Sequence, residues 1–423
     1  MSEPGTPGVG WRRVGVLRPF AIRDFRLLWF GMSVSMFGDG VFFVALIWQA
    51  YELTESPGKV ALIGLAWTVP MVALLLVGGV ISDRLDRRLV MIASDVIRGC
   101  AVTVLGVLAV TGNVELWHLV VLVAAYGAGD ALFPGAFNAL VPQLVPSEQL
   151  VQANSVDQLV RPLMLLMIGP AVGGLIVAGG GAGAAFLVDA GTFAVSTFAL
   201  ALMRSRPAQR AEDAGGMLAE IREGFRFVRS ATWIWGTLVC ASLFLLVYIG
   251  PWDVLIPYVV KNELGATARD LGFVYAASGL GAVIAAVVRA QRRLPRRAIT
   301  FMYLAFTLEA SMLVVYGFAA AVWHMLIAAF VAGVCIASAN VVWMTLLQRR
   351  VPGYLLGRVT SLDWLISTSL TPISFAVIGP VADAVGVQET LVAAGVIATV
   401  VTFAFLFIPG MRDLEREPQP VSG

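Results

Sequence analysis

Residues 61–88 read ALIGLAWTVPMVALLLVGGVISDRLDRR and change character abruptly near their end. The first 21 residues of this stretch carry no charged side chain, whereas five of the last six are charged. A helix of about 20 apolar residues is long enough to cross a hydrocarbon core of about 30 Å. The stretch therefore predicts a membrane-spanning helix that ends in a charged loop.

The same pattern recurs along the whole chain. Hydrophobic residues make up 59% of the 423 residues and charged residues only 13%, whereas soluble domains usually contain about 25% charged residues. This composition excludes a soluble globular protein and predicts an all-α integral membrane protein. Twelve predominantly apolar segments of spanning length lie at roughly 25–50, 58–82, 89–111, 117–141, 157–178, 182–204, 232–260, 270–290, 298–319, 322–347, 358–382 and 388–409.

The basic residues predict the orientation in the membrane. An even number of crossings puts both termini on one side. If that side is the cytoplasm, the 29 basic residues all lie on cytoplasmic loops or helix ends except Lys59, Lys261 and Arg269. This asymmetry follows the positive-inside rule. We therefore expect cytoplasmic termini in a bacterial inner membrane.

The two halves of the chain resemble each other. Residues 117–159 align with residues 323–365, and the alignment pairs Trp117 with Trp323 and Pro146 with Pro352. Such self-similarity is typical of transporters built from parallel repeats of six helices. We expect two pseudo-symmetric six-helix bundles, at residues 1–204 and 232–423.

Between these bundles lies the longest polar stretch, residues 205–231. Leu218, Ile221, Phe225 and Val228 fall on one helical face, which predicts a cytoplasmic linker with an amphipathic helix on the membrane surface. The linker is too short for a soluble domain, and the chain has no phosphate-binding loop of the GxxxxGK[ST] type. The sequence therefore indicates a protein that is not an enzyme.

The sequence gives no sign of a cofactor or a nucleic-acid partner. The three cysteines, Cys100, Cys240 and Cys335, are far apart in predicted helices, which argues against a metal cluster. The net charge of +2 also provides no broad basic field for nucleic acid. The expected partners are a small-molecule substrate, protons and the lipid bilayer, with the monomer as the functional unit.

The charged loop carries a recognisable pattern. It resembles the signature loop of the major facilitator superfamily, Gly-x-x-x-Asp-Arg-x-Gly-Arg-Arg, with Asp86 in place of the second glycine; the matching residues are Gly79, Asp83, Arg84, Arg87 and Arg88. The stretches RDFRLLWFGMSVSMFGDG, SDVIRG, LVPSEQLVQAN and IGPAVGGLI are similar to one branch of that superfamily. This branch contains macrolide-efflux and enterobactin-exporter-like proteins, also described as transmembrane secretion effectors.

The resemblance implies a role for the loop. Asp83 is expected to meet the start of the eleventh helix, with the arginines beside it meeting carboxylates and helix ends. A carboxylate at a helix N-terminus contributes up to about 2 kcal/mol in a partly buried setting. Such a contact would hold the two bundles together when the cytoplasmic side is closed. The alternative is that these charges only end the helix and follow the positive-inside rule.

The fifth predicted helix contains a second recognisable pattern. Gly169, Pro170, Gly173 and Gly174 resemble the last part of the antiporter motif, although the upstream glycines of that motif are absent here. Proline interrupts helix hydrogen bonding, and glycines allow close approach of helices. The pattern predicts a kinked, closely packed helix and leaves proton antiport open.

Acidic residues inside predicted helices are candidates for function, because a charge within a membrane is costly. Asp39 lies in the first helix and Asp130 in the fourth, and the resemblance implies that these two helices line the central cavity. Each residue is a candidate for proton coupling or substrate binding, with a structural hydrogen bond as the alternative.

Four other acids are given simpler interpretations. Glu309 and Asp189 are expected to be structural, and Asp253 to mark the outer membrane interface. Asp95 is three residues before Arg98, a spacing that suits a local ion pair.

A large organic substrate also requires apolar and hydrogen-bonding walls. The candidates for the cavity wall are residues within predicted helices that can stack on or hydrogen-bond such a ligand, with ordinary helix packing as the alternative for each: Trp67, Asn138, Tyr248, Asn340 and Trp343.

Together these features predict a secondary active transporter that exports amphiphilic small molecules, such as drugs, antibiotics or siderophores, by proton-coupled alternating access. The alternatives are an importer or facilitator of the same fold, or a membrane receptor or assembly protein that does not transport.

Overall fold

The computed structural model describes residues 15–204, 217–292 and 294–415. The side chains of residues 75–84, of 217–221 and of a few single positions lie outside the description. The described backbone is almost entirely helical and contains no β-strand. The predicted all-α membrane fold is confirmed.

The helices follow the predicted spans closely. The first half contains η2 (Gly15–Ala21), α1 (Arg23–Leu53), α2 (Pro57–Arg84), α3 (Arg87–Val110), α4 (Leu116–Asp130), α5 (Phe133–Leu144), η3 (Ser147–Gln149), α6 (Leu150–Arg161), η4 (Pro162–Ile168) and α7 (Gly169–Ala201). The linker contains α8 (Met217–Ser230). The second half contains α9 (Thr232–Gly250), η5 (Pro251–Leu255), α10 (Ile256–Tyr258), η6 (Val259–Glu263), α11 (Ala268–Ala290), α12 (Ala298–Gly317), α13 (Val322–Arg350), α14 (Gly353–Thr368), α15 (Thr371–Val385), α16 (Val387–Phe405) and η7 (Asp413–Glu415).

Eleven described segments are long and apolar enough to cross a membrane, and one of them supplies two crossings. This segment, Leu159–Ala201, has 43 residues, which as one straight helix would be about 65 Å long. Gly181 interrupts it with a φ of 76°. The neighbouring residues Gly38 and Gly40 of α1 pack against Thr192 and Gly169, on either side of Gly181. The chain therefore turns back at Gly181, and the fold has twelve crossings.

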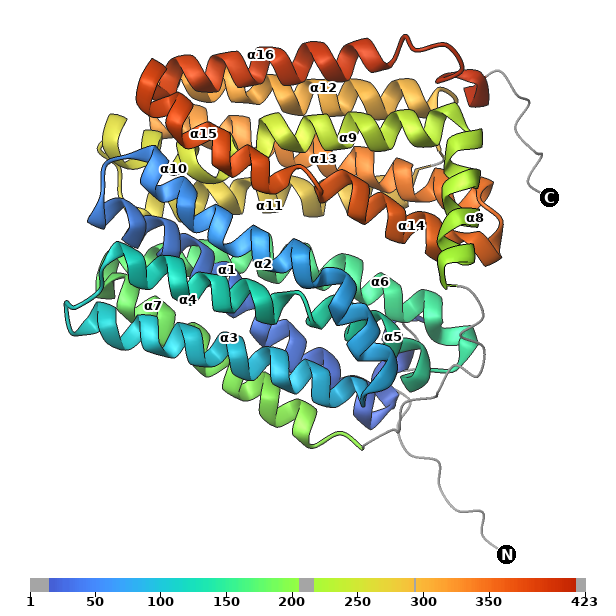
Figure 1. The fold of residues 1–423 in the computed structure, drawn as a ribbon, viewed down its shortest axis with the longest axis horizontal. Helices are drawn as coiled ribbons and strands as arrows, with labels where there is room; N and C mark the ends of the chain where they lie inside the picture. Colours follow the sequence, from blue (N-terminus) through green and yellow to red (C-terminus); the bar gives the residue numbers. More distant parts are fainter. Residues whose placement is uncertain (1–14, 205–216, 293, 416–423) are drawn as a thin grey trace, which may run out of the picture.

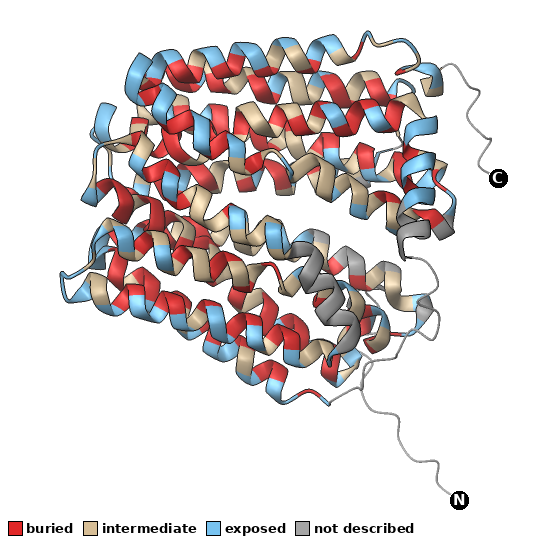
Figure 2. Ribbon diagram, in the orientation of Figure 1, coloured by how far each residue is buried: buried red, intermediate tan, exposed pale blue. Residues whose placement is uncertain are grey.

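The crossings form two six-helix bundles that lie side by side (Figure 1). We call the end of the molecule that carries the α2–α3 turn and α8 the motif end, and the other the opposite end. In Figure 1 the ribbons of the two bundles lie close together at the opposite end and diverge toward the motif end. Buried residues run along the interior of each bundle, and exposed residues are frequent on the outer helices (Figure 2).

The apolar core shows the same asymmetry. One cluster crosses between the bundles and contains residues from 41–51 of α1 together with residues from 254–260 and 268–275. The other two clusters each stay within one bundle, one around the first half of α1 and the other around α12 and α13. Among the residues whose side chains are described, the bundles therefore share a core on the side of the opposite end.

Hydrogen bonds between described residues of the two bundles also lie toward the opposite end. The Tyr51 hydroxyl donates to the carbonyl oxygen of Val254 at 2.7 Å. The Ser56 hydroxyl and the Gly58 N–H both donate to Oδ2 of Asp383, at 2.8 and 3.2 Å. Asp383 thus joins the start of α2 to the end of α15.

The internal repeat is visible in matching close contacts. A Cβ on Gly127 of α4 would collide with the carbonyl oxygen of Trp67 of α2. A Cβ on Gly333 of α13, its partner in the repeat, would collide with the carbonyl oxygen of Ser278 of α11. Each bundle therefore uses a glycine at the same place to bring two helix backbones together.

Prolines break several helices near the middle of the membrane. Pro134 follows the break between α4 and α5, and Pro372 follows the break between α14 and α15. Pro162 and Pro251 begin the π-helical segments η4 and η5. Proline lacks the N–H that a regular helix needs, so these breaks follow from the sequence.

The linker helix α8 lies across the motif end, beside α14 (Figure 1). Glu223 of α8 forms an ion pair with Arg358 of α14. Val228 is buried, whereas Phe225 is 50% exposed. An amphipathic surface helix was predicted here, and the described part of α8 lies at the surface.

The glycine contact in the second bundle generates a prediction. We expect Gly333→Ala to lower the free energy of unfolding by about 1–3 kcal/mol, because the added methyl group overpacks the α11–α13 contact. Gly357→Ala is the matched control, since a Cβ there meets no atom within 4 Å. Thermal unfolding of the purified protein in detergent measures both variants. Equal melting temperatures for Gly333→Ala and the wild type would contradict the close contact.

Candidate functional site

A cavity of about 260 Å³ lies between the two bundles. The first bundle supplies walls from α1, α2 and α4, and the second from α9, η5 and α15. Apolar side chains form most of the wall, including Phe43, Trp67 and Phe375. Two carboxyl groups, Asp130 and Asp253, are the acidic members. The cavity is therefore a small, largely apolar chamber with an acid from each bundle.

Asp130 and Asp253 both lie where a proline interrupts the regular helix. Asp130 is the last residue of α4, directly before the break that Pro134 follows. Asp253 lies in η5, where Ile256 N–H donates to the carbonyl oxygen of Pro251, five residues earlier. Such π-helical turns inside α-helices are frequent at functional sites, because the extra residue displaces the side chains of the turn.

Asp130 also belongs to a buried charge cluster centred on Arg98. Nη2 of Arg98 lies 2.8 Å from Oδ1 of Asp95. Nη1 lies 3.6 Å from Oδ1 of Asp39 and 3.7 Å from Oδ1 of Asp130. The side chain of Arg98 is only 4% exposed. One guanidinium group therefore serves three carboxyl groups from α1, α3 and α4.

Aromatic rings and hydroxyl groups complete the cluster. The Tyr126 hydroxyl donates to Oδ1 of Asp39 at 2.6 Å, and Ser196 donates to Oδ2 of Asp95 at 2.6 Å. The guanidinium carbon of Arg98 lies 4.6 Å from the ring centre of Phe193. Cation–π contacts of this kind strengthen when the cation is shielded from water.

The cluster reaches the cavity through Asp130. Nε1 of Trp67, a cavity residue, donates to Oδ2 of Asp130 at 3.4 Å. The side chain of Asp130 is 30% exposed and that of Asp39 is 20% exposed, whereas Asp95 is fully buried. A ligand in the cavity can therefore touch one carboxyl group that Arg98 also contacts.

Comparison with known proteins identifies the family. The model of the transmembrane secretion effector family matches residues 14–420. The chain belongs to the transmembrane secretion effector family, within the major facilitator superfamily.

The transporter is similar to named efflux proteins over nearly its whole length. It is 27% identical to the multidrug efflux pump Tap of Mycolicibacterium fortuitum, over 93% of this chain and 98% of that protein. It is 24% identical to macrolide efflux protein A of Streptococcus pyogenes, over 92% of this chain and 97% of that protein. A solved bacterial homologue of the iron transporter ferroportin, in an inward-facing state, shares the fold with a TM-score of 0.68 at 18% identity, over 90% and 98% of the two chains. The predicted class, a membrane transporter that is not an enzyme, is confirmed.

Two residues of the transporter have more contacts than their sequence positions predicted. The predicted ion pair between Asp95 and Arg98 is present, but Arg98 also binds acids on two other helices. Asp253 was expected only to mark the membrane interface, yet it lines the cavity. Two sequence features could have indicated these roles: Arg98 lies within a predicted membrane helix, and Asp253 follows Pro251 by two residues.

The five residues that were predicted to line a cavity lie in three different environments. Trp67 lines the cavity. Tyr248 is buried between Phe244 and Trp252, and Trp343 is buried and donates to Oδ2 of Asp363 at 2.9 Å. Asn138 and Asn340 are exposed and are not among the described residues that line this cavity.

Two acids that were assigned structural roles are deeply buried. Asp189 accepts a hydrogen bond from Thr192 at 3.0 Å, while its Oδ2 has no hydrogen-bond partner. Glu309 of α12 is 1% exposed, and its Oε2 has no hydrogen-bond partner. A structural partner for Glu309 was expected, and the described residues provide none for this oxygen.

The charged loop is only partly described. The contacts of Gly79 and the side chains of Asp83 and Arg84 lie outside the description. Arg87 donates to the carbonyl oxygen of Ala139 at 2.9 Å. Arg88 donates to the carbonyl oxygens of Met203 and Ala201. These described bonds join helix ends within the first bundle, whereas carboxylates beside the eleventh helix were also expected as partners.

The glycines of the fifth crossing lie where backbones approach closely. A Cβ on Gly173 would lie 2.8 Å from Cα of Val41 in α1. A Cβ on Gly174 would lie 3.0 Å from Cα of Gly272 in α11, and one on Gly169 2.7 Å from the carbonyl oxygen of Phe37. Pro170 is the second residue of α7, which directly follows the π-helical segment η4. This crossing therefore packs tightly against α1 in its own bundle and against α11 in the second bundle.

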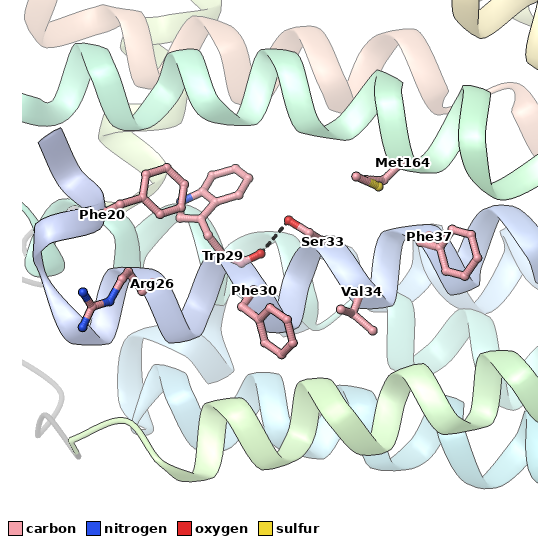
Figure 3. Close-up of a pocket in the computed structure, with 8 residues that line it drawn as sticks. All are labelled: Phe20, Arg26, Trp29, Phe30, Ser33, Val34, Phe37 and Met164. Atoms are coloured by element: carbon pink, nitrogen blue, oxygen red, sulfur yellow. Dashed lines mark hydrogen bonds between the residues drawn. The ribbon is translucent and has the colours of Figure 1, made fainter. Parts of the chain in front are cut away.

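A larger hollow, of about 620 Å³, lies along the first half of α1 (Figure 3). Its walls come only from the first bundle, and include Arg26, Phe30 and Met164. Figure 3 shows it between α1 and the helix that carries Met164. Because no residue of the second bundle lines it, this hollow is not the cavity between the bundles.

Removal of the central cation gives a testable outcome. We expect Arg98→Gln to lower the free energy of unfolding by about 3–5 kcal/mol, because it leaves buried carboxyl groups without their cation. Adding Asp95→Asn to that variant is expected to restore part of the loss. Fluorescence-detected thermal unfolding in detergent measures the single and double variants. Additive losses in the double variant would show that Arg98 and Asp95 act independently.

Proposed function

We propose that the protein is a proton-coupled exporter of amphiphilic small molecules that works by alternating access. One observation carries this proposal: Asp130 is shared between the cavity and the buried Arg98 cluster. A group in that position can respond both to the cargo and to a proton.

Charge balance supports proton coupling. Arg98 is the only cation that contacts the cluster among the described residues, whereas Asp39, Asp95 and Asp130 are three carboxyl groups. Uncompensated charge inside a membrane costs several kcal/mol. At least one of the three is therefore expected to hold a proton when the cavity contains no cationic cargo. Asp39 and Asp130, as the more exposed members, are the proposed coupling residues.

The relatives support export of drug-like cargo. The names of two similar proteins describe efflux, one of multiple drugs and one of macrolides. The cavity walls are apolar and aromatic with few polar groups, which suits amphiphilic molecules. Trp67, which lines this cavity, is the residue that we propose stacks on such a ligand.

The positive-inside rule supports the orientation. The motif end, with the charged loop and the linker, is proposed to face the cytoplasm of a bacterial cell and to carry both termini. With the shared core at the opposite end, the structure then corresponds to an inward-facing state. Residues 1–204 and 232–423, joined by the linker of residues 205–231, would rock as units about a central site in a functional monomer.

Transport assays test the coupling residues. We expect Asp39→Asn and Asp130→Asn each to abolish uphill efflux driven by a pH gradient in proteoliposomes, because the proton-carrying group is lost. Glu52→Gln is the control, since Glu52 is exposed at the opposite end and its side chain accepts a hydrogen bond from Trp48 of its own helix. Full activity in both aspartate variants would exclude this coupling site.

The direction of transport has its own test. Cells that produce the wild-type protein are expected to accumulate less fluorescent dye than cells that produce the Asp130→Asn variant. Greater accumulation in the wild type, across chemically diverse dyes, would instead indicate an importer.

The charged loop gives a further prediction. We expect Asp83→Asn to insert normally but to slow transport, because loss of a contact worth up to about 2 kcal/mol changes the balance of states by up to about 30-fold. Asp157→Asn is the control, because Asp157 pairs with Arg161 of its own helix at 3.0 Å. Initial rates of dye efflux measure the effect. A wild-type rate for Asp83→Asn would remove the proposed role of the loop.

A further inference from the structure

We propose that Asp253 is the cargo-binding carboxylate of the second bundle, and that the preferred cargo is an organic cation held between Asp253 and Asp130. This inference rests on the proposed export function and specifies its substrate class. It starts from the cavity geometry, in which the two acids enter one apolar chamber from opposite bundles.

Asp253 has no cation partner in the described part of the chain. It takes part in no ion pair or hydrogen bond with another described residue, and its side chain is partly exposed to the cavity. Arg98, the cation of the buried charge cluster, already contacts Asp39, Asp95 and Asp130. The countercharge for Asp253 must therefore come from a proton or from a ligand.

The groups around Asp253 leave room for a ligand cation. Asp253 lies two residues after Pro251, the first residue of η5. Nearby aromatic rings pack against its neighbour Trp252, whose ring centre lies 5.7 Å from that of Tyr275 and 5.9 Å from that of Tyr316. Across the cavity, Trp67 donates its N–H to Asp130 rather than to Asp253. No lysine or arginine is among the described residues that line the chamber. Every fixed charge in this described wall is therefore negative.

The walls suit the rest of such a cargo. Phe43, Trp67 and Phe375 present aromatic rings, and aromatic faces attract organic cations. The remaining wall is aliphatic, so an amphiphile can bury its apolar body while its charged nitrogen lies between the carboxylates. A neutral molecule of the same shape gains the apolar contacts but leaves both carboxylates without a partner.

The position of the two acids connects cargo to transport. Asp130 belongs to the first bundle and Asp253 to the second, so a cation between them contacts both moving units. A proton on either carboxyl group removes one of the negative charges that hold the cation. Cargo and protons therefore compete at this site, as exchange across the membrane requires.

Direct binding tests the inference separately from transport. The probe is radiolabelled tetraphenylphosphonium, and purified protein in detergent is titrated at constant salt and pH. We expect Asp253→Asn to weaken binding at least tenfold and Asp253→Glu to weaken it by less, because the charge is retained. Glu52→Gln, which removes an exposed carboxylate at the opposite end, should stay within twofold of the wild type. Binding of the neutral relative triphenylphosphine oxide should be unchanged by Asp253→Asn.

The outcomes separate this inference from the proposed function. Equal tetraphenylphosphonium affinity in the wild type and Asp253→Asn, or no binding by the folded wild type, would overturn the inference while dye export could still stand. Asp253-dependent binding without export from cells would support the cation site and remove the export function. Melting temperatures of each variant confirm that the folded protein is compared.

Discussion

The buried guanidinium group of Arg98 is the interaction on which the first bundle depends. It contacts carboxyl groups from α1, α3 and α4, and packs over the ring of Phe193 on α7. In a medium with little water, each of these carboxyl groups requires a cation, a proton or hydrogen bonds. Arg98 therefore positions four crossings relative to one another and limits how much negative charge the cluster can hold.

The cavity links this cluster to the second bundle. One helix break follows Asp130 and another surrounds Asp253, and each break is associated with a proline. The two acids, which belong to different crossings, line the same chamber. The bundles meet around the chamber on the side of the opposite end, where Tyr51 and Asp383 make hydrogen bonds across the interface. Rigid bundles, a local contact zone and a charged chamber are the physical parts that alternating access needs.

Much of the fold could be predicted from the sequence. Apolar segments of spanning length, the repeat that pairs Gly127 with Gly333, and the resemblance carried by residues 79–88 predicted twelve helices in two bundles. Asp130 and Trp67, two candidates from the sequence, also line the described cavity. These features are local, because length, hydrophobicity and motif spacing are read along the chain.

The rest of the site could not be predicted in this way. Periodicity cannot tell which face of a crossing meets another crossing, so Tyr248 and Trp343 were expected at a cavity and are buried in helix packing instead.

The sequence by itself determined that the chain is a membrane protein with twelve crossings. It also identified the acidic residues whose burial in the membrane would be costly. Only the tertiary structure decided that Arg98 reaches three carboxyl groups and that Asp253 shares a chamber with Asp130. The physical reason is that charge interactions depend on distance through space, and residues from different helices approach one another only when the bundles pack.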